Sequence, residues 1–174
     1  MGYSGNRLAS LVQIELLHDA LEEATTEVAD IWLVTTVANT PIGGRFDGSE
    51  RGGNLRTSWY KTLPLKTWEG GGPKWVVHIE THVEYAPHVE YGTGLWGPHH
   101  AKYPIRPKKA KMLSWINPLT GKRVFSSFVM HPGSPGQHML AIGASRAEAQ
   151  AEGTIERTLE RVWVRGSERR AKAS

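Results

Sequence analysis

The stretch HVEYAPHVEYGT, residues 82–93, decides how the rest of the chain is organised. It closes an alternating run, residues 75–83, in which apolar and β-branched residues recur at every second position, as in a half-buried strand. Ala86 precedes a proline and is therefore disfavoured in a helix, whereas Pro87 suits the first helical position because it has no N–H to leave unpaired. The sequence thus predicts a strand that ends here and one or two helical turns that follow it.

The side chains of this short helix are expected to divide between a core and a rim. Three of them are predicted to pack back on the sheet: Tyr85, Val89 and Tyr91. Gly92 stands where a C-terminal cap with positive φ is expected. Glu84 and Glu90 are expected to remain at the rim.

Length and composition favour one soluble domain. A chain of 174 residues can bury a sizeable core without staples. It contains no cysteine, which excludes a disulfide framework and a thiolate metal site and makes the cytoplasm the simplest place of synthesis. No signal-peptide pattern follows Met1, and no window approaches the ~20 apolar residues that span a bilayer. We therefore expect a protein that is neither exported nor inserted in a membrane.

Charge and aromatic content leave two readings open. The 21 basic and 17 acidic residues make a mild positive excess that decides little about nucleic acid. Seven tryptophans either form the core or lie at protein interfaces, where this residue is enriched.

The N-terminal part, residues 6–36, has apolar residues at three- and four-residue steps, which predicts a long helix lying on a sheet. Its opposite face is acidic, and is either solvated or in contact with a neighbouring subunit: Glu15, Asp19, Glu22, Glu23, Glu27 and Asp30. Residues 39–53 contain five glycines and no apolar period, which predicts a long loop that orders on binding. Asn54 is expected to cap a short helix.

The remaining segments complete an α+β domain. Residues 60–68 and 75–83 are predicted to form one hairpin, and residues 112–116 and 122–130 another. A second loop is expected over residues 94–104. Further on, a helix is expected over residues 137–165 with a break or bend at Gly143 and Gly153, and then a flexible basic tail over 166–174. Together these predict a single domain, residues 1–165, with an antiparallel sheet of about four strands and a long helix from each end of the chain packed on one face.

Three motifs follow one another along the chain: Gly-Asn-Leu-Arg-x-Ser at 53–58, Tyr-Ala-Pro-x-Val-Glu-x-Gly-Thr at 85–93 and His-Pro-Gly at 131–133. In this order, with a strand before the second motif, the chain closely resembles the tail-completion or head–tail joining proteins of long-tailed double-stranded DNA phages and related prophages. In those proteins His-Pro-Gly usually leads to Pro-Phe-Leu-Arg-Pro-Ala, whereas residues 137–140 here read Gln-His-Met-Leu.

The resemblance implies a structural virion protein without enzymatic activity or cofactor. Such a protein is made in the host cytoplasm and forms a ring, expected to be a hexamer, at the head–tail junction or neck. Its partners would be copies of itself, the head connector or stopper, the tail terminator or tail tube, and DNA that passes through the channel without sequence specificity. The residues expected at subunit or partner contacts are Ile42, Arg45, Phe46, Arg51, Glu84, Glu90 and Trp96.

Two basic sets are candidates for the DNA channel. The first set precedes the second predicted hairpin: Arg106, Lys108, Lys109 and Lys111. The second set has a four-residue spacing on the last predicted helix: Arg157, Arg161 and Arg165. Attraction to phosphates needs no base contact, so a basic channel lining would suffice. The alternative reading is a charged strand edge and a solvated helix stripe.

A metal-dependent hydrolase or nuclease is the alternative function. His78, Glu80 and His82 recur at every second position of the predicted strand, which would place them on one face. This spacing is not one of the closed zinc signatures. The sequence also lacks a Gly-x-Ser-x-Gly elbow and a Walker-type phosphate loop, so the enzyme reading is the weaker of the two.

Overall fold

The computed structural model describes residues 4–42 and 53–173, with side chains from residue 13 onward except those of residues 170 and 173. Contacts divide the chain into two compact units, where the sequence predicted one domain. The first, here called the helical unit, combines the residues up to Val83 with those from Met139. The second, the inserted unit, comprises Glu84–His138. The inserted unit therefore interrupts the sequence of the helical unit.

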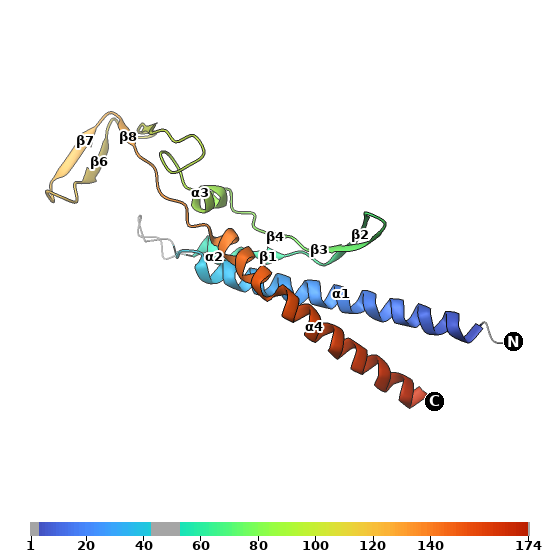
Figure 1. Ribbon diagram of the computed structural model, residues 1–174. Helices are drawn as coiled ribbons and strands as arrows, with labels where there is room; N and C mark the ends of the chain where they lie inside the picture. Colours follow the sequence, from blue (N-terminus) through green and yellow to red (C-terminus); the bar gives the residue numbers. More distant parts are fainter. Residues whose placement is uncertain (1–3, 43–52, 174) are drawn as a thin grey trace. The chain divides into compact units, whose positions relative to one another are not determined.

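Two long helices, α1 (Ser4–Asn39) and α4 (Met139–Ala173), form the helical unit's core and run side by side in opposite directions (Figure 1). Leu16, near the start of α1, meets Gly166 near the end of α4, while Trp32 meets Gly143. The buried residues between the helices are mostly small: Ala20, Ala24, Thr36, Gly143, Ala147, Thr154, Thr158 and Val162. Small side chains allow two helix axes to approach closely, so these residues set the packing.

A hairpin and a short strand pair lie against α1. Strands β2 (Leu65–Glu69) and β3 (Gly72–Val76) are antiparallel, and Gly70 and Gly71 between them have φ values of 61° and 85°. Two positive φ values in succession are what a tight hairpin turn requires. The Trp75 ring lies 5.4 Å from the ring of His18 on α1. The hairpin predicted in this region is confirmed.

The connection around this hairpin anchors it to the end of α1. Strand β1 (Tyr60–Lys61) pairs with β4 (Ile79–Glu80), and the preceding short helix α2 (Asn54–Thr57) has Gly53, not Asn54, as its N-cap. Trp59 is buried and donates its indole N–H to Thr40 Oγ1 at 2.9 Å. Lys61 forms an ion pair with Asp30 at 2.5 Å.

The inserted unit contains the short helix α3 (Ala86–Tyr91) and two antiparallel strand pairs. Strand β5 (Tyr103–Ile105) pairs with β8 (Val129–His131), and β6 (Leu113–Ile116) pairs with β7 (Arg123–Ser126). In the turn between β6 and β7, Asn117 Oδ1 accepts a hydrogen bond from the Leu119 N–H at 2.9 Å. The predicted hairpin is therefore confirmed for β6 and β7, whereas β8 pairs elsewhere.

The predicted sheet of about four strands is wrong. Among the described residues every sheet consists of two strands, although the mixture of helix and strand and the two long terminal helices are as predicted. One cause is Pro64, which has no N–H to donate to a strand ladder and ends the pairing of β1 before β2 begins. Without a wide sheet to cover, α1 packs mainly on α4. Consequently Ile14 and Leu17, predicted to lie on a sheet, remain 49% and 48% exposed.

Helix α4 corrects two further predictions. It runs without interruption through Gly143 and Gly153, and it continues to Ala173 where a flexible tail was expected from residue 166. A β-carbon at Gly143 would lie 2.5 Å from Trp32 Cδ1, and one at Gly166 would lie 2.8 Å from Leu16 Cδ1. These two glycines are thus required by close packing on α1, and that packing offsets their low helix propensity.

Candidate functional site

The second motif of the resemblance builds the start of the inserted unit. Tyr85 is the N-cap of α3, and the helix begins at Ala86, one residue before the Pro87 at which the sequence predicted its start. The helix ends at Tyr91, and Gly92 follows with a φ of 80°, which confirms the expected positive-φ cap. This sharp exit directs the following residues against a distant part of the chain.

That distant part is the third motif, and the two segments cross backbone to backbone. The Thr93 N–H donates to the Ser134 carbonyl at 2.8 Å, and the Leu95 N–H donates to the Pro132 carbonyl at 2.7 Å. In return, the Ser134 N–H donates to Thr93 Oγ1 at 3.0 Å. We call this arrangement of residues 92–97 and 132–136 the glycine crossing.

Glycine is essential at the centre of this crossing. A β-carbon on Gly133 would lie 1.9 Å from the Thr93 carbonyl oxygen, and one on Gly94 would lie 2.2 Å from the Pro132 carbonyl oxygen. Both residues also have positive φ values, 95° and 63°, which residues with side chains rarely adopt. Gly133 of the third motif and Gly94, directly after the second motif, are therefore glycines because each segment occupies the space beside the other's backbone.

The residues after the crossing cap α3. The Gln137 N–H donates to the Val89 carbonyl at 2.8 Å and the His138 N–H donates to the Glu90 carbonyl at 3.1 Å. These carbonyls belong to the last turn of the helix, where no intrahelical partner exists. Residues 137 and 138 thus contribute backbone N–H groups to this arrangement.

The faces of α3 differ from the prediction. Glu90, expected at the rim, is 4% exposed, while Tyr85 and Tyr91, expected in the core, are 46% and 58% exposed. Ala86 is buried with Glu90, and the two stand four residues apart on one face of the helix. Because no wide sheet lies behind α3, the aromatic residues have no apolar layer to pack on. Glu84 is exposed, as expected.

This burial leads to a prediction for the two glutamates. Glu90→Ala is expected to lower the free energy of unfolding by about 1–3 kcal/mol, because the substitution leaves the buried groups around this side chain without their polar partner. Glu84→Ala, at an exposed position, is expected to change it by less than about 0.5 kcal/mol. Urea denaturation of both variants measures the difference. Equal stability of the two variants would contradict the buried position of Glu90.

An open groove of about 650 Å³ lies beside α3 and the crossing. Its lining is aromatic and basic and contains no carboxylate: it includes Pro87, His88, Tyr91, His99, Lys102 and Tyr103. A groove with this lining has room for an apolar or aromatic side chain. The sequence analysis did not find this groove, because its lining comes from α3 and from a loop with no regular period.

The remaining residues predicted at partner contacts are spread over both units. Trp96, within the glycine crossing, is 49% exposed, and Ile42, at the end of the described N-terminal segment, is 63% exposed. Arg45, Phe46 and Arg51 lie outside the described residues. The structure therefore does not bring the predicted contact residues together into one site.

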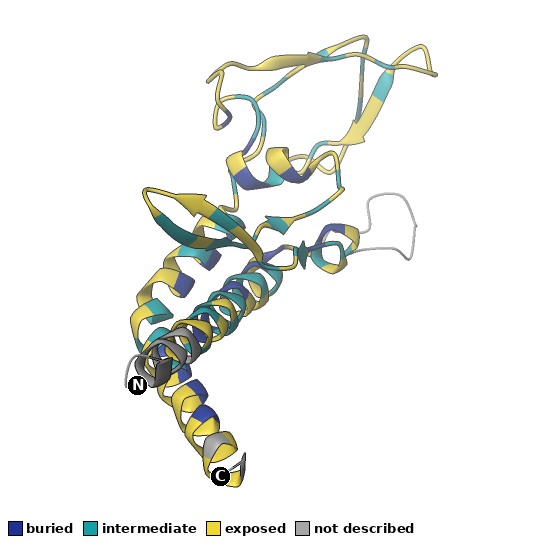
Figure 2. Cartoon of the chain, turned by 90° about the vertical axis from the view of Figure 1, so that its right-hand side faces the viewer, coloured by how far each residue is buried: buried dark blue, intermediate teal, exposed yellow. Residues whose placement is uncertain are grey.

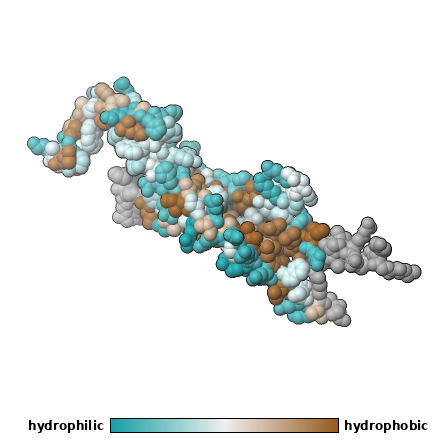
Figure 3. All heavy atoms as spheres, viewed as in Figure 1, coloured by the Kyte–Doolittle hydropathy of each residue, from teal (hydrophilic) through white to brown (hydrophobic). Residues whose placement is uncertain are grey.

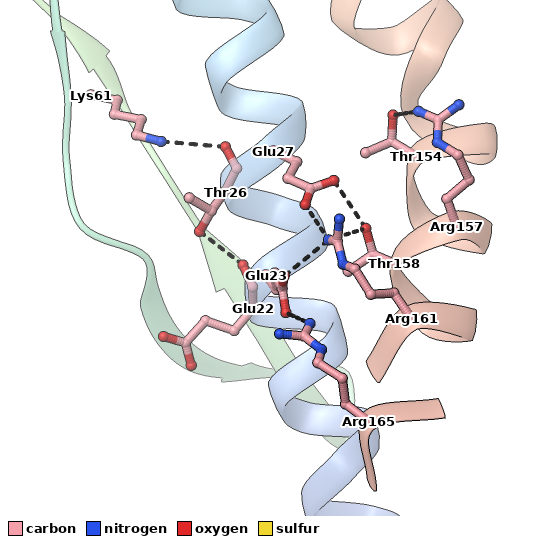
Figure 4. Close-up of polar contacts among 10 residues, drawn as sticks. All are labelled: Glu22, Glu23, Thr26, Glu27, Lys61, Thr154, Arg157, Thr158, Arg161 and Arg165. Carbon is pink, nitrogen blue, oxygen red and sulfur yellow. Dashed lines mark hydrogen bonds and ion pairs between the residues drawn. The ribbon is translucent and has the colours of Figure 1, made fainter. Parts of the chain in front are cut away.

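The first basic set is exposed, and the second is largely engaged within the chain. Arg106 lies over the Phe128 ring at 5.6 Å, and the three lysines that follow it are exposed. On α4, Arg157 donates to Thr154 Oγ1 at 3.1 Å, whereas Arg161 and Arg165 bind the acidic face of α1 (Figure 4). The acidic face that was expected to be solvated or to meet a neighbouring subunit is thus partly neutralised by the same chain.

The contacts in Figure 4 form a small network between the two long helices. Arg161 binds Glu27 and, at 2.9 Å, Glu23, while Arg165 binds Glu23 at 2.6 Å. Thr158 Oγ1 donates to the second carboxylate oxygen of Glu27 at 3.1 Å. The hydrogen bond that Arg161 donates to Glu27 and the charge of both carboxylates raise the pKa of Arg161 above its ordinary value. Because these groups are partly exposed, the ion pairs contribute little to the free energy of folding. Their main effect is to determine which residues of the two helices face each other.

The proposed histidine face does not form a metal site. Strand β4 comprises only Ile79 and Glu80, so the regular alternation stops before His82. Glu80 accepts a hydrogen bond from the Tyr60 hydroxyl at 3.0 Å, which raises the pKa of Tyr60, and the His82 ring lies 5.1 Å from the Tyr60 ring. Over the described ranges, no three His, Asp or Glu side chains come together as a possible metal-ligand set. The alternative function has no geometric support here.

The helices give one further result. In the described part of the chain, none of them combines the length and the apolar composition needed to cross a bilayer.

Comparison of the sequence and structure with protein-family models, curated proteins and solved structures finds no significant match.

Proposed function

We propose that this chain is a structural subunit of a ring at the head–tail junction of a long-tailed double-stranded DNA phage or prophage. The observation that carries the proposal is the glycine crossing. The second motif ends at Thr93 and the third ends at Gly133, and nevertheless the backbones of these two residues are in direct contact, so that a β-carbon on Gly133 would lie 1.9 Å from the Thr93 carbonyl oxygen. Motifs that build one substructure support the resemblance more strongly than three short matches do separately.

The exposed apolar residues also favour an assembly role. Leu63, Trp68 and Leu119 are 87%, 71% and 93% exposed, and they belong to hairpins or their flanks in both units. Figure 2 shows β6 and β7 largely in the exposed colour. Extended segments with exposed apolar side chains are typical of surfaces that other proteins cover. The partners in this proposal are further copies of the chain in a ring, expected to be a hexamer, together with the neighbouring connector and tail proteins.

Passage of DNA needs only a positive potential along the channel. Arg106 and the exposed lysines after it are candidates to supply this potential without reading sequence. Arg161 and Arg165 are weaker candidates, because Glu23 and Glu27 already neutralise them. In this proposal the protein has no enzymatic role and needs no cofactor.

Ring formation is the direct test. The purified chain is expected to form closed annular particles of several copies, visible by negative-stain electron microscopy and measurable by analytical ultracentrifugation. Phage particles made without the protein are expected to yield separate heads and tails, which join when the protein is added. A chain that stays monomeric and has no effect on joining would overturn the proposal.

A further inference from the structure

The β6–β7 hairpin, residues 112–126, is an arm that needs a partner. Its strands pair only with each other, and a two-stranded hairpin is marginally stable in water by itself. The register places Ser114 opposite Phe125 and Ile116 opposite Arg123, so these four residues share one face. On that face Ile116 and Phe125 are 62% and 60% exposed. An apolar face of this kind becomes stable when another surface covers it.

The arm and the residues just before it carry most of the positive charge of the inserted unit. That unit has seven Lys and Arg against two Glu, and one of the two, Glu90, is buried. Five of the seven basic residues lie in the arm or just before it, and all five are exposed: Lys108, Lys109, Lys111, Lys122 and Arg123. Within the described residues none of the five forms an ion pair. The complementary surface should therefore be apolar and acidic.

The helical unit has an apolar groove between α1 and α4. It has a volume of about 310 Å³ and is lined by residues that include Leu16, Leu17, Leu159 and Trp163. Trp163 is 54% exposed. Figure 3 shows hydrophobic surface gathered over α1 where it runs beside α4. The antiparallel pair thus buries only part of its apolar surface.

An acidic row borders this groove. Four exposed glutamates follow one another on α4 at four-residue steps: Glu148, Glu152, Glu156 and Glu160. Residues three and four apart are neighbours on a helix, so Glu156 adjoins Leu159, and Glu160 adjoins Trp163. Like charges at this spacing repel one another, and no ion pair among the described residues relieves them. A cationic partner would remove this repulsion.

We propose that the arm of one copy docks on the α1–α4 groove of the next copy, with Lys122 and the lysines just before the arm on the acidic row. Lysines placed there are neutralised, which leaves Arg106 as the DNA-channel candidate of this basic set. This inference rests on the proposed ring and identifies the two surfaces that would join its subunits. The arm and the groove are different surfaces of the same chain, so the contact is heterologous, and repeated heterologous contacts close into a ring when the rotation between copies allows it. Opposite charges on the two surfaces would also fix the order of subunits and disfavour contacts between like surfaces.

Charge reversal of each surface tests the docking. In the first variant Lys108, Lys109 and Lys111 are replaced by Glu, and in the second Glu152, Glu156 and Glu160 are replaced by Lys. In either variant the residues just before the arm carry the same sign as the row. A control with the same change in net charge as the second variant replaces Glu15, Asp19 and Glu22 of α1, which are exposed and lie outside the lining of the α1–α4 groove, by Lys. Circular dichroism confirms folding, and analytical ultracentrifugation measures assembly.

Each reversed variant alone is expected to lose the ring species at concentrations where the wild-type chain and the control are fully assembled. An equal mixture of the two variants is expected to restore the ring species. In the mixture the negative arm region of the first variant can meet the positive row of the second, and the positive arm region of the second can meet the negative row of the first. Assembly of the first variant alone, even with reduced binding to DNA, would overturn the docking and leave the ring proposal intact. Failure of the mixture to restore assembly would also overturn it. A wild-type chain that forms no ring would overturn both proposals.

Discussion

Replacing Gly133 with alanine is expected to unfold the inserted unit, whereas replacing Gly121 with alanine is expected to leave it folded. Both glycines have positive φ values, 95° and 66°. A β-carbon at Gly133 would overlap the Thr93 carbonyl at 1.9 Å, whereas one at Gly121 meets nothing within 4 Å. Alanine at Gly121 therefore costs only the unfavourable backbone angle, about 1–2 kcal/mol, while alanine at Gly133 adds the separation of two backbone segments, about 3 kcal/mol or more in total.

Hydrogen exchange measured by mass spectrometry distinguishes these outcomes. The Thr93 and Leu95 amides, which donate across the glycine crossing, should exchange fast in Gly133→Ala and at the wild-type rate in Gly121→Ala. The Gly133 variant should also lose assembly, because the arm then lacks a fixed base. Wild-type protection of both amides in Gly133→Ala would show that the crossing is not a constraint on the fold.

The two glycines in α4 are expected to respond to alanine with opposite signs. A β-carbon at Gly143 would lie 2.4 Å from Thr36 Oγ1 and 2.9 Å from the Trp32 carbonyl oxygen, and the latter belongs to a rigid backbone. Gly143→Ala should therefore push the helices apart and destabilise the fold by about 1–3 kcal/mol. At Gly153 the nearest atom, Arg157 Nη1, is 4.0 Å away, so alanine fits and should stabilise the helix by up to about 1 kcal/mol.

Thermal denaturation followed by circular dichroism at 222 nm reports on both variants, because α1 and α4 hold most of the helical residues. The melting temperature should fall for Gly143→Ala and rise for Gly153→Ala. A rise in both would mean that helix propensity outweighs packing at Gly143, and would contradict the close approach of α1 and α4.

Local signals in the sequence predicted the elements correctly where neighbouring residues decide the outcome. The turn around Asn117 and Gly121 predicted the β6–β7 hairpin, and Pro87 predicted the start of α3, because turn and cap chemistry depends on residues close in sequence. Gly143 was predicted to break or bend the helix because glycine has a low helix propensity, which is also a local property. Its actual role depends on Trp32, more than 100 residues away, whose indole N–H also donates to the Leu140 carbonyl at 3.0 Å.

Local sequence patterns did not determine which surface covers each apolar face. The period of α1 predicted an amphipathic helix but did not distinguish a sheet from a second helix as the surface that covers it. Likewise, residues 85–91 showed a short helix, but the exposed aromatic residues and the buried Glu90 follow from the crossing of residues 92–97 with 132–136. The candidate contact residues were predicted one at a time, and the groove beside α3 is lined by α3 and the loop that follows it, which has no regular period in the sequence.

The pairing of the first helix with the last also has a consequence for biosynthesis. Trp32 and Leu140, which join the two helices, are separated by 108 residues. At a translation rate of ~5–20 residues per second, α1 must wait about 5–20 s on the ribosome before its partner has been made. During this interval the alanine-lined face of α1 is uncovered, and the inserted unit emerges complete before α4 does. Truncation of the chain before α4 leaves this face of α1 uncovered.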